Sequence, residues 1–179
     1  MFARTGTRIV PVDISGDLLA KARERSLPPD RVLFLEKRFE DCELDGPFDA
    51  VVGSSVLHHL EVVESLNRIH ALLKPGGVMC FAEPNLLSPQ VFIERKFTFL
   101  RPWLSYVSPD ETAFVRWRIA AALRCSGFEE EEVTPFDWLH PATPEWLIGT
   151  VSALEQFLER MPILREFSGS VLIRCRRPP

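Results

Sequence analysis

The chain has 179 residues, 46% of them hydrophobic, so it has the length of one domain and enough apolar side chains for a buried core. Its 25 acidic and 21 basic side chains give a formal net charge of −4, which provides no overall attraction to a nucleic-acid backbone. We therefore expect small-molecule or protein partners and no nucleic acid.

Four cysteines stand far apart in the sequence, with no C-x-x-C pair and no histidine at metal-ligand spacing. The first residues lack the apolar core of a signal peptide, and no stretch reaches the roughly 18 consecutive apolar residues of a membrane span. We expect a cytoplasmic protein with no metal site, in which the cysteines are buried free thiols. They are Cys42, Cys80, Cys125 and Cys175.

From residue 9 to residue 82, short apolar runs alternate with amphipathic segments. This alternation favours βαβ units and a parallel sheet covered by helices, which is an α/β fold. Ser15 is the predicted N-cap of the first helix. Strands are predicted at 9–12, 32–35, 48–52 and 78–82, and helices at 17–25 and 62–73.

After residue 85 the segments become longer, aromatic and helical. Helices are predicted at 89–100, at 108–125 and from Thr143 to before Pro162. Ser108 and Glu111 have the spacing of a capping box, and Gly127 is the predicted stop of that helix. Strands are predicted at 128–133 and 170–175.

Asp13 ends the first predicted strand. Nucleotide-binding α/β folds place a carboxylate at such a strand end, where it accepts hydrogen bonds from two ribose hydroxyls. The alternative is that Asp13 only caps the following helix.

Three segments together resemble the class I S-adenosylmethionine-dependent methyltransferases: Arg8–Ser15, Phe48–Leu60 and Leu73–Gly77. The resemblance implies a Rossmann-like three-layer αβα fold with S-adenosyl-L-methionine as the cofactor. It implies methyl transfer to an oxygen or nitrogen of a small or lipid-like metabolite. We expect a single domain over 1–179, with cofactor-side βαβ units at 1–85 and lid helices and the last two strands at 86–179.

The resemblance also implies a cofactor site. Asp13 and Ile14 would hold the ribose side, Phe39 would stack on the adenine, and a floor beneath the reactive sulfonium would come from Gly53, Ser54 and Ser55. Arg38 stands where the family usually carries an acidic residue that accepts the adenine amino group. A guanidinium cannot accept that hydrogen bond, and Glu40 or Asp41 would take its place if the loop is shifted by a residue or two.

His58 and His59 follow the predicted floor, where either imidazole could act as a general base toward a hydroxyl nucleophile. The alternative is that one histidine packs under the sheet and the other is solvated. Glu83 and Asn85, just past the next strand, would face the substrate pocket.

A set of aromatic residues follows, interleaved with basic ones, where the family inserts a lid over the substrate. Ordinary core packing is the alternative, and contact with a membrane surface is the least favoured interpretation. The aromatic residues are Phe92, Phe97, Phe99, Trp103 and Tyr106, and the basic ones are Arg95, Lys96 and Arg101.

The family's first strand and its glycine-rich loop would precede the segment that starts near Ile9. In the family's sheet this first strand lies between the second and the fourth strands, which correspond here to residues 9–12 and 48–52. We therefore expect an N-terminally incomplete fold of marginal stability, unless the second strand pairs directly with the fourth. The alternative function is a non-catalytic methyltransferase-like module that binds a partner protein through a sheet edge or the aromatic helices. A nicotinamide-dependent oxidoreductase is a distant third.

Overall fold

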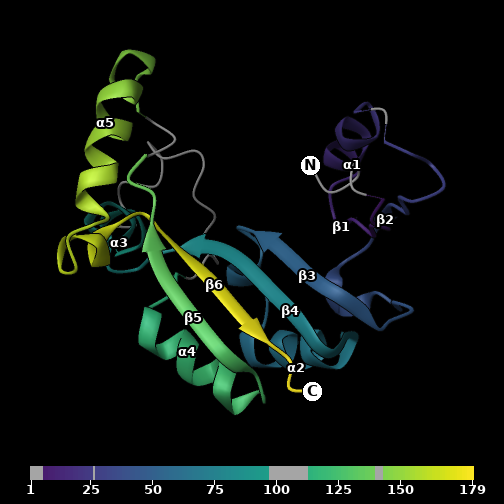
Figure 1. Ribbon diagram of the computed structural model, residues 1–179. Coiled ribbons are helices and arrows are strands. Elements are labelled where there is room, and N and C mark those ends of the chain that lie inside the picture. Colours follow the sequence, from purple (N-terminus) through teal and green to yellow (C-terminus); the bar gives the residue numbers. More distant parts are fainter. Residues whose placement is uncertain (1–5, 26, 97–112, 140–142) are drawn as a thin grey trace. The chain divides into compact units, whose positions relative to one another are not determined.

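The computed structural model describes residues 6–25, 27–96, 113–139 and 143–179, and its strands form two sheets (Figure 1). The chain divides into two compact units, Met1–Asp45 and Gly46–Pro179, which we describe one at a time. The predicted division of a single domain at residue 85 stays a prediction.

The first unit holds a two-stranded parallel sheet of β1 (Val12–Asp13) and β2 (Leu35–Glu36). Hydrogen bonds run further than these short strands, since Ile9 exchanges main-chain bonds with Arg31 and Leu33. Pro11 accepts from the Leu35 amide but has no N–H to donate, which interrupts the ladder between the two parts. The predicted strand at 9–12 is therefore present as a bridge followed by a short strand.

Helix α1 (Gly16–Arg23) connects the two strands of this sheet. The predicted N-cap is confirmed, because the Ser15 hydroxyl accepts the Leu18 amide at 3.3 Å. A short 3₁₀ turn, η2 (Phe39–Asp41), follows β2.

The second unit holds a four-stranded sheet in the order β3-β4-β6-β5. β3 and β4 are parallel, whereas β6 is antiparallel to both of its neighbours. The predicted strands at 9–12 and 48–52, which correspond to the family's second and fourth, thus belong to different sheets. The four strands are β3 (Phe48–Ser54), β4 (Leu73–Pro84), β5 (Glu129–Phe136) and β6 (Ser170–Arg176).

Helices connect these strands. The 3₁₀ turn η3 (Leu57–His59) and α2 (Val62–Leu72) lie between β3 and β4. Then come α3 (Pro89–Lys96), α4 (Arg116–Cys125) and α5 (Glu145–Leu158), and a last 3₁₀ turn η5 (Leu164–Phe167) precedes β6. The described part of the predicted 108–125 helix begins at Arg116, because Val115 is extended and Phe114 bridges Asn85. The capping box at 108–111 lies outside the described residues, whereas Gly127 does end α4, at a φ of +82°.

Figure 1 shows α2 and α4 on one side of the four-stranded sheet. The core on this side is apolar, because alternate residues of β4 and β6 point into it. It contains Leu57, Leu66, Ile69, Leu73, Met79, Phe81, Leu123, Val171, Ile173 and Cys175.

The segment Lys74–Gly77 forms an irregularity within β4. Phe48 pairs with Leu73 and Ala50 with Val78, so residues 74–77 bulge out of the ladder, and Gly76 adopts a φ of +75°. The chain's last arginines hold this bulge, since Arg176 donates to the Gly76 carbonyl at 2.6 Å. Arg177 Nη1 donates to the carbonyls of His70, Ala71 and Leu73, which end α2.

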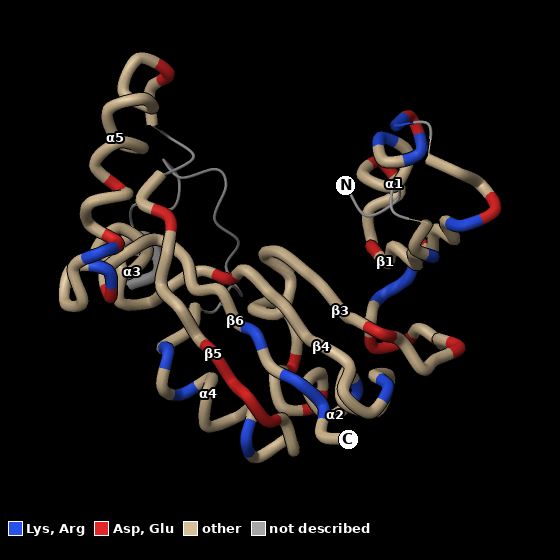
Figure 2. The backbone as a smooth tube through the Cα atoms, viewed as in Figure 1, with Lys and Arg blue, Asp and Glu red and all other residues tan. Residues whose placement is uncertain are grey.

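The two edges of the four-stranded sheet differ in charge. β5 carries a run of glutamates that face the arginines of β6, as Figure 2 shows. Glu130 accepts from Arg176, and Glu132 pairs with Arg174. β3 pairs with no described strand on its other edge and leaves the Val52 side chain 56% exposed. Charge thus protects one edge from further strand pairing, and the other edge stays apolar.

The expectation of buried thiols is right for Cys42 and Cys175 and wrong for Cys125, which is exposed near the end of α4. Burial raises the pKa of the Cys175 thiol to about 12, so this side chain stays protonated. No helix within the described part of the chain is both long and apolar enough to cross a membrane.

The contacts of Arg177 predict a stability effect. Arg177→Ala should lower the free energy of unfolding by about 1–3 kcal/mol, since the α2 carbonyls would lose a charged donor in a half-buried position. Arg118→Ala, at an exposed position of α4, is the control and should change it by less than about 0.5 kcal/mol. Urea unfolding measures both, and equal effects would contradict the capping role.

Candidate functional site

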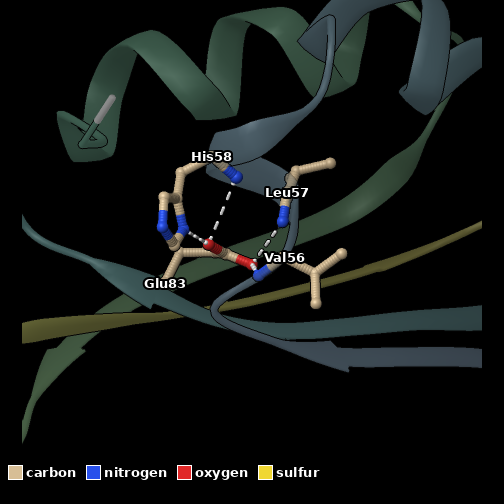
Figure 3. A network of polar contacts seen from close by, with 4 residues as sticks. All are labelled: Val56, Leu57, His58 and Glu83. Carbon is tan, nitrogen blue, oxygen red and sulfur yellow. Dashed lines mark hydrogen bonds and ion pairs between the residues drawn. The ribbon is translucent and has the colours of Figure 1, made fainter. Parts of the chain in front are cut away.

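A buried carboxylate organises the loop that follows β3 (Figure 3). Glu83 is only 1% exposed, and its Oε1 accepts the main-chain amides of Val56 and Leu57 at 3.1 and 2.9 Å. Its Oε2 accepts the His58 amide at 3.4 Å and lies 2.7 Å from the His58 ring nitrogen Nδ1. Both oxygens of this carboxylate are therefore occupied by groups of the protein.

The burial of Glu83 follows from its place in β4. Met79 and Phe81 occupy the alternate buried positions before it, and Glu83 continues that face. It lies at the carboxyl end of the strand, beside the end of β3, where the loop amides are within reach. The alternation of buried residues along this strand could have predicted from the sequence that Glu83 is buried.

The structure separates the roles of the two histidines. The His58 side chain is 3% exposed and pairs with Glu83, whereas His59 is exposed. Their rings are 4.0 Å apart between centroids. One histidine is therefore packed and the other reaches solvent, and a part for either in proton transfer stays a prediction.

Asn85 is buried and forms hydrogen bonds with the protein. Its Nδ2 donates to the carbonyls of Glu166 and Ser168, and its Oδ1 accepts the Leu87 amide. Asn85 thereby joins the end of β4 to the segment before β6. The predicted part of Glu83 and Asn85 in a substrate pocket stays a prediction.

The predicted floor residues lie at the carboxyl end of β3. Ser54 and Ser55 are exposed, and Ser55 adopts a φ of +52° while its amide donates to the Ala82 carbonyl at 2.8 Å. Gly53 has a reason within the fold, because a Cβ built there would overlap the Phe81 ring. The small side chain at residue 53 therefore accommodates a neighbouring ring of the sheet, whatever it also does for a ligand.

In the first unit, Asp13 ends β1 as predicted. Its Oδ1 accepts the Ser15 amide at 2.8 Å, which fixes the turn into α1. Ile14 is 72% exposed, and Phe39 is half-buried at the start of η2. Arg38 pairs with Glu40 and Asp41 within the same turn.

Glu36 is a residue that sequence reasoning missed. It ends β2 and is the register partner of Asp13, so two carboxylates stand together at the carboxyl end of this small sheet. A Cβ on Gly16 would lie 2.9 Å from Glu36 Oε1, so the absence of a side chain at Gly16 lets this carboxylate approach α1. The sequence signal that could have identified Glu36 is an acidic residue at the end of the second strand, which matches Asp13 at the end of the first.

Most of the predicted aromatic lid falls outside the described residues. Phe97, Phe99, Trp103, Tyr106 and Arg101 lie there, and Phe92 of α3 is 44% exposed. Within the described part of the chain, no group of three or more His, Cys, Asp or Glu side chains could hold a metal ion.

Comparison with known proteins finds similarity to methyltransferases. A family model described as a methyltransferase domain matches residues 1–79. A solved S-adenosylmethionine-dependent methyltransferase from Mesorhizobium loti superposes with a TM-score of 0.67 at 21% identity, over 96% of this chain and 81% of the other. The chain has the Rossmann-like fold of the S-adenosylmethionine-dependent methyltransferases. A likewise similar structure is the N-methyltransferase NodS of Bradyrhizobium japonicum in complex with S-adenosyl-L-homocysteine, with a TM-score of 0.59 at 15% identity, over 96% of this chain and 67% of the other.

Some sequence relatives are methyltransferases by name. An uncharacterized methyltransferase of Mycobacterium tuberculosis is 29% identical over 98% of this chain and 79% of its own. A putative methyltransferase of Bacillus subtilis is 26% identical over 63% of this chain. A highly reducing polyketide synthase of Purpureocillium lilacinum is 29% identical over 72% of it. The chain spans 51% of the Bacillus protein and 5% of the polyketide synthase.

The contact between Gly53 and Phe81 predicts a coupled effect on stability. Gly53→Ala should lower the free energy of unfolding by about 1–3 kcal/mol, because the added methyl group overlaps the ring. In the double variant with Phe81→Leu, the cost of the alanine should shrink, which gives a coupling energy of about 1 kcal/mol or more in a thermodynamic cycle. Strict additivity of the two changes would contradict the overlap.

Proposed function

We propose that this chain is an S-adenosylmethionine-dependent methyltransferase that acts on an oxygen or nitrogen of a small or lipid-like metabolite. The observation that carries the proposal is the methyltransferase-domain match over residues 1–79 together with the similarity of the fold to a solved methyltransferase. Methyl transfer needs little covalent chemistry from the protein, since the enzyme aligns the nucleophile with the methyl carbon and excludes water.

The residues of the first unit fit the nucleoside part of this cofactor. Asp13 presents a carboxylate at a strand end, where it can accept from the two ribose hydroxyls. Ile14 follows it with an exposed apolar side chain, and Phe39 offers a ring for stacking on the adenine. Arg38 offers no acceptor for the adenine amino group.

The residues of the second unit fit the end of the cofactor that carries the reactive methyl group. The exposed Ser54 and Ser55 main chain, with Gly53, would form the floor below the sulfonium, which supplies the methyl group when the cofactor is bound. His59 would accept the proton of the nucleophile, since it is exposed beside that floor. His58 is held by Glu83, and a direct part in proton transfer falls to His59.

One structural relative supports part of the proposed acceptor class. The Bradyrhizobium protein is named an N-methyltransferase, which supports a nitrogen nucleophile.

The second candidate, a module that binds a partner protein, is favoured by α5. None of the fourteen residues of this helix is buried, and Trp146 and Phe157 are 79% and 61% exposed. Failure of the chain to bind S-adenosylhomocysteine would favour this candidate.

The proposed ribose contact predicts a loss of affinity. Asp13→Ala should weaken the binding of S-adenosylhomocysteine by about 1.5–3 kcal/mol, the value of charge-assisted hydrogen bonds, as isothermal titration calorimetry of the full chain measures. Asp17→Ala, at an exposed position in the first turn of α1, is the matched control and should leave the affinity unchanged. Equal affinity in both variants would reduce Asp13 to a helix-capping residue.

The proposed base predicts a loss of turnover. His59→Ala should lower kcat by about 100-fold or more and leave the affinity for S-adenosylhomocysteine nearly unchanged. Transfer of labelled methyl groups from S-adenosylmethionine to a panel of amines and phenols measures this. His70→Ala is the control, because that ring packs on Phe128. A wild-type rate in His59→Ala would remove the histidine from the mechanism.

A further inference from the structure

The Glu83 carboxylate has no remaining capacity for a substrate. A carboxylate offers about four acceptor positions. Three main-chain amides and the His58 ring nitrogen occupy them, and the Glu83 side chain has no exposed surface. A residue so arranged acts on its neighbours and does not bind a ligand.

We propose that Glu83 is a positioning residue that fixes the segment Ser55–His59 and thereby the orientation of the His59 imidazole. This inference rests on the function proposed above. It replaces the part in a substrate pocket that the sequence suggested for Glu83.

The turn η3 connects the carboxylate to His59. Glu83 holds the amides of Val56, Leu57 and His58 at the start of this turn, and the His59 amide then donates to the Val56 carbonyl at 3.0 Å. The turn therefore cannot rotate without breaking bonds to a buried charge, which is costly.

The His58 ring is the second connection. Its Nδ1 bond to Glu83 fixes the ring, and the His59 ring lies against it at a tilt of 38°. His59 is thus held from its main chain and from its neighbouring ring, while its own side chain is exposed.

The test uses Glu83→Gln in the full chain. Glutamine has the same size, but its amide nitrogen donates, so it cannot accept from all four groups. Arg177→Ala is the control, because it loosens the end of α2 without touching the Glu83 contacts.

The first measurement is nitrogen-15 NMR of the protein without cofactor. The wild-type chain should carry a proton on His58 Nδ1 and show amide protons of Val56 and Leu57 shifted by their bonds to a carboxylate. Glu83→Gln should abolish both signatures, and Arg177→Ala should keep them. Unchanged signatures in Glu83→Gln would overturn the proposed hold on the loop.

The second measurement is methyl transfer from labelled S-adenosylmethionine to amines and phenols, at a temperature where every variant is folded. Glu83→Gln should lower kcat by about tenfold or more, because small misplacements of a catalytic group are costly, and change KM for S-adenosylmethionine by less than about threefold. Arg177→Ala should keep the wild-type kcat.

The outcomes separate the two proposals. Lost NMR signatures with an unchanged kcat would overturn the positioning role and leave Glu83 as a structural brace. A wild-type chain that transfers no methyl group would overturn the proposed function, whereas the NMR result still decides whether Glu83 fixes the loop.

Discussion

The buried Glu83 carboxylate sets the geometry of the loop after β3. Removing a charge from water costs several kcal/mol, so such a group persists only where donors surround it. Here the donors are consecutive amides of one loop and the ring of His58. The loop supplies the donors that the carboxylate needs, and the carboxylate in turn holds the loop in place. These hydrogen bonds join the end of β4 to the loop after β3.

Other features of the second unit join distant segments in a similar way. Arg177 satisfies the last carbonyls of α2, and Asn85 ties the end of β4 to the segment before β6. These side chains use orphan main-chain groups as partners, which buried backbone requires wherever a helix or strand ends. The elements that surround the proposed floor and His59 therefore have ends that are fixed by hydrogen bonds.

The glycines of the chain serve different physical needs. Gly76 adopts a backbone conformation that other residues rarely reach, and Gly53 leaves room for the Phe81 ring. The string Lys74–Gly77 resembles a methyltransferase motif, and in the fold it forms a bulge whose Gly76 carbonyl accepts from Arg176. A small residue near a proposed ligand site can therefore be required by the packing of the protein and not by the ligand.

The sequence by itself determined the alternation of strands and helices, the Ser15 cap and the α/β fold class. Periodicity and capping are local, and a few residues suffice to specify them. Only the tertiary structure decided which histidine is buried, what Glu83 binds and why residue 53 is glycine. Glu83 and His58 are 25 residues apart, and Arg177 reaches carbonyls more than 100 residues away. No local pattern encodes such contacts, because they exist only once the strands have been brought together.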